Sequence, residues 1–126
     1  MSGSTDQKLK DLLLTLNRLK KEYKTDTPLL LKVSPDIKDN CVPEIVDLAI
    51  KNDISAIILT NTTNDNRDNL TSDIKKEEGG LSGEPLRQIS TDMIKKFYKQ
   101  LNGKIPIIGV GGVNSGKSAY EKIIAG

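Results

Sequence analysis

Three short apolar runs, each followed by a segment of helical periodicity, constrain the fold of this chain most strongly. The runs cover residues 29–34, 55–61 and 105–108, and the helical segments cover 43–51, 85–101 and 117–125. Repeated units of one strand and one helix favour a parallel sheet. The sequence therefore predicts an α/β fold with about three parallel strands and flanking helices. Both a (β/α) barrel and a doubly wound sheet fit this order.

Two details of the pattern predict what covers these elements. A helix from Ser4 or Thr5 to about Lys24 precedes the first strand, and we expect its apolar face to cover the core. That face consists of Leu9, Leu12, Leu13, Leu16, Leu19 and Tyr23. The run from Ile105 to Ile108 shows no alternation of apolar and polar residues, which is typical of a parallel strand covered on both faces.

Composition excludes several classes of function. The 126 residues carry 19 Lys and Arg against 17 Asp and Glu, and this balance argues against a nucleic-acid surface or a polybasic membrane patch. Cys41 is the only cysteine and histidine is absent, so we expect no disulfide and no metal site. No apolar run is long enough to span a bilayer, and the first residues lack the core of a signal peptide. We expect one domain over residues 1–126.

The third apolar run leads into a glycine turn at Gly109, Gly111 and Gly112. Without a Cβ, these residues allow a sharp bend and a close approach of the backbone to a ligand. The turn leads to the start of a helix, where free N–H groups favour an anion. We expect this turn to bind a phosphate, with a tight turn that binds no ligand as the alternative.

The other two strands also end in groups suited to binding. Lys32 lies among apolar neighbours in the first strand, and a buried ammonium needs a polar or negative partner. An edge strand that carries a protective lysine is the alternative. The second strand ends in the hydroxyl and amide groups of residues 60–63, which suit an oxygen-rich planar ligand or, alternatively, a turn. Because parallel strands end at one rim, we predict that Lys32, Thr60, Asn61 and Gly112 converge there.

A polar stretch at residues 62–78 follows the second strand and is long for a loop in a compact domain. Loops of this length are usually functional lids or partly disordered segments. The glycine-rich residues 79–83 close the stretch before the third helix begins at Pro85.

Residues 111–118 also match the P-loop pattern G-x-x-x-x-G-K-[ST], ending in Lys117 and Ser118. A P-loop protein additionally needs an acidic residue at the end of a neighbouring strand to hold Mg²⁺. The second strand ends in Thr60 and Asn61, which supply none. A stand-alone phosphate- or nucleotide-binding module with a P-loop-like turn is therefore the alternative function.

Four segments, residues 31–36, 59–63, 79–87 and 105–113, together resemble the dihydroorotate dehydrogenase family in order and spacing. Residues 85–91 resemble its class 2, which is membrane-associated and uses quinone. The resemblance implies an FMN-binding (β/α)₈ barrel, of which this chain covers the middle-to-late part. It also implies the oxidation of dihydroorotate to orotate in pyrimidine (UMP) synthesis: a base removes a proton from carbon, hydride passes to the flavin, and quinone reoxidises the flavin.

The resemblance assigns roles to individual residues. Lys32 would contact the flavin ring and Thr60 would bond to it, while Asn61 and Thr62 would bind dihydroorotate or orotate. The remaining FMN-binding positions would be Ser82, Gly83, Gly111 and Gly112. It places the catalytic base upstream, so we expect no catalytic residue here and no activity of the isolated chain. Quinone and membrane would be reached through segments outside this sequence, with the parent enzyme peripheral to the mitochondrial inner or the bacterial cytoplasmic membrane.

Overall fold

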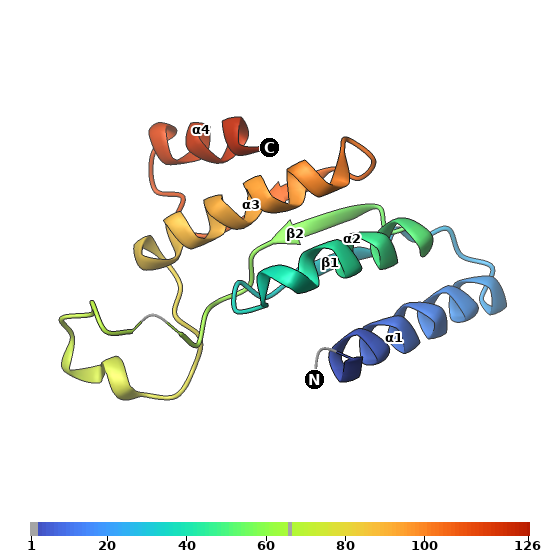
Figure 1. Ribbon diagram of the computed structural model, residues 1–126, viewed down its shortest axis with the longest axis horizontal. Helices are drawn as coiled ribbons and strands as arrows, with labels where there is room; N and C mark the ends of the chain where they lie inside the picture. Colours follow the sequence, from blue (N-terminus) through green and yellow to red (C-terminus); the bar gives the residue numbers. More distant parts are fainter. Residues whose placement is uncertain (1–2, 66) are drawn as a thin grey trace.

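The computed structural model describes residues 3–65 and 67–126 (Figure 1). Four α-helices, three strands and three short 3₁₀ turns follow one another along this part of the chain. In chain order they are α1 (Gly3–Glu22), β1 (Leu30–Val33), η1 (Asp39–Cys41), α2 (Val42–Lys51), β2 (Ala56–Leu59), η2 (Asp73–Lys76), η3 (Glu84–Leu86), α3 (Arg87–Leu101), β3 (Ile107–Gly109) and α4 (Gly116–Ala125).

The strands form one parallel sheet in the order β1-β2-β3. Lys32 pairs with Ile58, which pairs in turn with Ile108, so these three residues share a row across the sheet. In parallel strands that pair in register, one face of each strand continues onto the same face of its neighbour. The sheet therefore has one face with Lys32 and Ile108 and an opposite face with Val33 and Leu59.

Helices α2 and α3 cover the face of the sheet that carries Val33, Ile57 and Leu59 (Figure 1). These strand residues form one buried cluster with apolar side chains of α2 and α3, including Phe97. Sequential strand order with both crossover helices on one face is the winding of a (β/α) barrel, and one half of a doubly wound sheet shares it. The predicted α/β fold with three parallel strands and flanking helices is thus confirmed, and its winding agrees with the predicted part of a barrel.

The opposite face of the sheet is open in this chain, so the expected coverage of both faces is wrong. Leu30 is 45% exposed and Ile108 42% exposed on that face, and Lys32, two residues after Leu30 on β1, is exposed as well. Apolar runs without alternation do arise in barrel strands, because the face turned away from the helices lines the barrel interior. The open face of this sheet corresponds to that interior.

The apolar face predicted for α1 is buried only in part. Leu13 is buried, but Leu12 and Tyr23 are more than half exposed. Helix α1 lies beside α2, at the margin of the sheet (Figure 1). Because α1 packs against a neighbouring helix, only one of its apolar rows reaches the core.

Several element boundaries differ from the sequence prediction, and two of these differences have a reason in backbone chemistry. Strand β3 begins at Ile107 instead of residue 105, since Pro106 has no N–H group for the ladder and contributes only its carbonyl, which accepts from Ile57 N at 3.0 Å. Pro85 lies in the 3₁₀ turn Glu84–Leu86, and α3 begins only at Arg87. Helix α3 ends as predicted, with Asn102 in the left-handed conformation at φ 49°.

Between β2 and α3, the described residues 62–65 and 67–83 form a long excursion with little regular structure (Figure 1). An antiparallel bridge between Thr63 and Leu81 closes its base. None of the helices in the described part of the chain is both long enough and apolar enough to cross a membrane.

Candidate functional site

The predicted site residues meet at the carboxyl end of the sheet. Asn61 N donates to Val33 O at 2.9 Å, one residue beyond Lys32, and Thr60 N donates to Val110 O at 3.0 Å, two residues before Gly112. These bonds tie the ends of all three strands together. The prediction that Lys32, Thr60, Asn61 and Gly112 converge on one rim is therefore confirmed as geometry.

The glycine turn offers open donors to this rim. After β3 the chain passes through Val110 into Gly111, Gly112 and Val113. The backbone N–H groups of residues 111–113 have no hydrogen-bond partner among the described residues. Gly111 has φ 126° and Gly112 has φ 66°, which are conformations that favour glycine. Three consecutive N–H groups without a partner could donate hydrogen bonds to an anion.

Tight packing against the start of α3 is a second reason for glycine at these positions. A Cβ at Gly111 would lie 3.2 Å from the Cβ of Ser90, and a Cβ at Gly112 would lie 2.8 Å from Gly83 O and 2.5 Å from the Cβ of Arg87. The turn therefore rests on the start of α3 and on the loop before it. Gly83 and Gly112, both predicted to bind the same ligand, are in contact.

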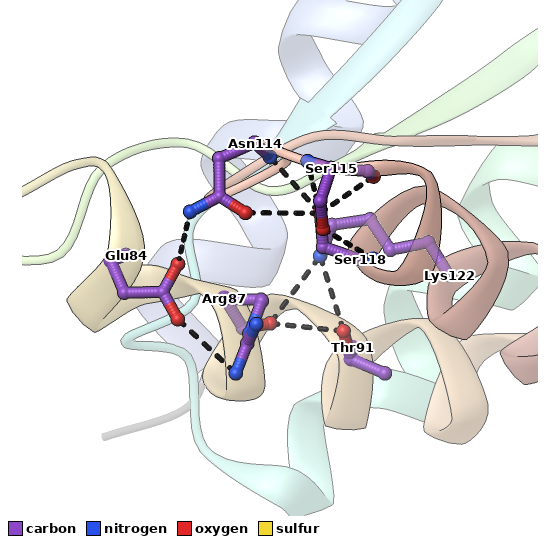
Figure 2. Close-up of polar contacts among 7 residues, drawn as sticks. All are labelled: Glu84, Arg87, Thr91, Asn114, Ser115, Ser118 and Lys122. Carbon is purple, nitrogen blue, oxygen red and sulfur yellow. Dashed lines mark hydrogen bonds and ion pairs between the residues drawn. The ribbon is translucent and has the colours of Figure 1, made fainter.

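A polar bridge holds these two loops together (Figure 2). Asn114 Nδ2 donates to Glu84 Oε2 at 2.9 Å, and the other carboxylate oxygen pairs with Arg87 Nη2 at 3.1 Å. Glu84 thus links the turn after β3 to the first turn of α3. From the motif 79–87 the sequence predicted only Ser82 and Gly83 as site residues. It gave no role to the residues of this bridge, whose two ends are 30 positions apart and have no local sequence signature.

The remaining predicted residues occupy different environments at the rim. Thr60 is buried, and its hydroxyl donates to Asn61 O at 2.8 Å, so this hydroxyl can meet a ligand only as an acceptor. Asn61 and Ser82 are exposed, as expected of groups that face a ligand. Thr62 is exposed too, and its side chain occupies the space that a Cβ at Gly80 would need.

Asp36 is an organising residue that the sequence did not reveal. Its carboxylate accepts hydrogen bonds from the Thr63 hydroxyl and, at 2.8 Å, from Asn64 N. Thr63 is fully buried and also forms the bridge to Leu81. Asp36 therefore couples the loop after β1 to both ends of the excursion after β2.

The helix after the glycine turn is capped in a way that excludes a P-loop. Ser118 Oγ is buried and accepts from Asn114 N and Ser115 N, each at 3.0 Å, while Ser118 N donates to Ser115 Oγ at 3.1 Å (Figure 2). In a P-loop, those backbone N–H groups bind phosphate and the Ser118 hydroxyl position binds Mg²⁺. Both are engaged in a capping box here, and Lys117 is exposed.

A buried lysine beneath the turn was also missed. Lys122 on α4 is 5% exposed, and its Nζ donates to Ser90 Oγ at 3.0 Å, Thr91 Oγ1 at 3.2 Å and Arg87 O at 3.3 Å. Burial lowers the pKa of Lys122 from its ordinary value of 10.5, and the Arg87 guanidinium lowers it further, while Glu121 acts in the opposite direction. The sequence shows only a lysine on a short helix, where an exposed position is expected.

Comparison with known proteins identifies relatives of the whole chain. The family model described as dihydroorotate dehydrogenase matches residues 2–126. The dihydroorotate dehydrogenase (quinone) of Christiangramia forsetii is 42% identical over 118 residues, covering 94% of this chain and 34% of the relative. That of Idiomarina loihiensis is 43% identical over 124 residues, covering 98% of this chain and 37% of the relative.

A solved structure agrees with the fold described above. The crystal structure of the Eimeria tenella DHODH in complex with ferulenol superposes with a TM-score of 0.74 at 41% identity, covering 78% of this chain and 26% of that chain. This chain thus spans about a third of the length of the curated relatives it matches.

Proposed function

Because this chain belongs to the dihydroorotate dehydrogenase family, we propose that its rim holds FMN and binds dihydroorotate in a quinone-dependent dehydrogenase of pyrimidine synthesis. The observation that carries the proposal is the set of open N–H groups at residues 111–113, at the same end of the sheet as Lys32. A phosphate accepts hydrogen bonds at such a turn, and a flavin ring attached to it can extend along the rim.

The hydrogen-bonding groups and the charge at the rim support the proposal of FMN. Gly111 and Gly112 would hold the phosphate, with Ser82 and Gly83 against the cofactor on the neighbouring loop. Gly83 and Gly112 are in contact, so the loop before α3 and the turn after β3 lie side by side and could contact the same ligand. Bound FMN would supply the acceptor for the hydride that leaves dihydroorotate.

Lys32 is suited to stabilise charge at the flavin ring. Its side chain is exposed on the open face of the sheet, in the same row as Ile58 and Ile108. A flavin ring and the rest of a barrel would cover this face and lower the local dielectric, so an ammonium there would stabilise negative charge more strongly than it would in water. Thr60 would bond to the flavin, while Asn61 and Thr62 would bind the carboxylate and the pyrimidine edge of the substrate.

The remaining parts of the reaction are proposed to lie outside the matched third of the relatives. Proton abstraction from carbon needs a positioned base, and the rim described here carries a lysine, hydroxyls and amides. We therefore assign the base, the quinone site and the peripheral membrane contact of the parent enzyme to segments that this chain does not match, and we expect no turnover by this chain alone.

Titration of the chain with FMN and with riboflavin, followed by flavin fluorescence, tests this proposal. Riboflavin lacks the phosphate, so FMN should bind at least about tenfold more tightly. Lys32→Met should lower the affinity for FMN and for riboflavin by about tenfold each, because both ligands carry the flavin ring that Lys32 would contact. Lys38→Met, an exposed lysine in the loop after β1, is the matched control and should leave both affinities unchanged. Equal binding of FMN and riboflavin to the unaltered chain would refute a phosphate site at the turn.

A further inference from the structure

The ammonium of Lys122 is the most deeply placed charge near the rim, and it lies on a helix that contributes no predicted ligand. All three of its hydrogen bonds go to α3, at Arg87 O, Ser90 Oγ and Thr91 Oγ1. Figure 2 shows the bonds to Arg87 and Thr91. An ammonium has three donors, so these contacts use its full capacity. Lys122 therefore fastens α4 to the first turns of α3.

Ser90 extends this connection to the ends of two strands. Its hydroxyl lies 2.6 Å from Val110 O and 3.3 Å from Leu59 O, which are the last carbonyls before the glycine turn and before Thr60. The Ser90 hydroxyl thus connects Lys122 to the ends of β2 and β3, just before Thr60 and just before Gly111.

The same two side chains, together with Ile94 and Leu86, pack against the glycine turn. A Cβ at Gly109 would lie 3.3 Å from Cδ of Lys122, and a Cβ at Gly111 would lie 3.2 Å from Cβ of Ser90. The stem of Lys122 and the body of Ser90 therefore pack closely under the backbone of the turn.

The charge of Lys122 is solvated by neutral oxygens. Its three acceptors are one carbonyl and two hydroxyls, and Arg87 adds a second positive charge nearby. Burying a charge in this way costs stability, whereas a hydrophobic side chain of equal length would not carry that cost. A dianionic phosphate on the other side of the turn would offset the cost.

We infer that Lys122 is a positioning residue for the glycine turn. Through Ser90 it holds the turn in place, and its positive charge favours the binding of a phosphate there. This inference rests on the proposed function. Lys122 would touch neither the phosphate nor the flavin ring, and would act through the backbone of the turn.

The test compares FMN with riboflavin on the chain carrying Lys122→Met, which keeps the length of the side chain and removes the charge. FMN affinity should fall by about tenfold, at the lower end of what outer partners contribute at binding sites, while riboflavin affinity should not change. Lys117→Met removes an exposed lysine from the first turn of the same helix and should change neither affinity. If Lys122 had a purely structural role, Lys122→Met would lower the affinities for FMN and riboflavin equally, and that result would overturn the inference.

Ser90→Ala keeps the test decisive if Lys122→Met does not fold, as judged by circular dichroism. It removes the connection to Val110 O while Thr60 N still bonds to that carbonyl, so it should lower the preference for FMN over riboflavin in the same direction. If the unaltered chain prefers FMN but neither variant alters the preference, the inference alone is wrong. If the unaltered chain shows no preference, the proposed function fails and the inference falls with it.

Discussion

Ser118 Oγ lies 3.0 Å from the backbone nitrogen of Asn114 and so occupies a position where a nucleotide phosphate would have to bind in a P-loop. The N–H groups of residues 111–113 stay open, whereas those of Asn114 and Ser115 are closed by this hydroxyl. An anion could therefore accept hydrogen bonds from the N–H groups of residues 111–113, but not from those of Asn114 and Ser115.

The first prediction is that Lys117→Ala leaves FMN binding unchanged and that the chain does not bind ATP with Mg²⁺. Lys117 is exposed, and the capping box engages the groups that a nucleotide would need. Isothermal titration of both ligands with the unaltered chain and the variant measures this. Tight Mg²⁺-dependent ATP binding that Lys117→Ala abolishes would reverse the assignment.

Gly112→Ala should lower the free energy of unfolding by about 2 to 4 kcal/mol, from a left-handed backbone and from the overlap with Gly83 O. Gly116→Ala is the matched control, because a Cβ at Gly116 would meet nothing within 4 Å. It should stay within about 0.5 kcal/mol or stabilise the helix. Urea denaturation compares the two, and equal losses would show that the packing under the turn has been misjudged.

Asp36→Asn should loosen the excursion at residues 62–83. The amide keeps one acceptor for the Thr63 hydroxyl but turns an N–H₂ donor toward Asn64 N, which is itself a donor. Tryptic cleavage after Lys75 and Lys76 should become about fivefold faster, since local opening exposes the chain to protease. Asp47→Asn on α2, where Asp47 pairs only with the exposed Lys51 at 2.7 Å among the contacts described, should leave the cleavage rate unchanged.

The buried Lys122 should also give the chain a specific pH dependence. Its pKa is lowered in the folded chain and returns to about 10.5 on unfolding, so between these two values the unfolded chain binds more protons and stability rises with pH. Arg87 and Glu121 are the charged groups that influence it. The free energy of unfolding of the unaltered chain, relative to Lys122→Met, should therefore increase as pH rises toward 10.5. A difference that is independent of pH would contradict the lowered pKa.

The sequence predicted the sheet and its rim because both follow from chain order. Once Lys32, Thr60 and Gly112 are assigned to the ends of parallel strands, topology alone brings them to one edge. The open face was not predicted, because an apolar run such as Ile105 to Ile108 reads the same whether helices or a barrel interior cover it.

The misses share one physical cause, which is that they depend on contacts between distant segments. Asp36 and Thr63 are 27 positions apart, and Lys122 and Ser90 are 32 apart. Helical periodicity assigns a lysine to the exposed side by default, so only the packing of α4 on α3 reveals that Lys122 is buried. Ser118 matched a P-loop in sequence, but its role was decided by the backbone groups that it caps.

The most direct measurement of the central claim is dihydroorotate-dependent quinone reduction by two proteins assayed side by side. One is this chain alone with FMN added. The other is the Idiomarina loihiensis relative in which this sequence replaces the matching 124 residues. We predict that the exchanged protein retains bound flavin and turns over, and that the chain alone does not. An exchanged protein that folds without flavin, or turnover by the chain alone at a rate near that of the intact relative, would contradict the account.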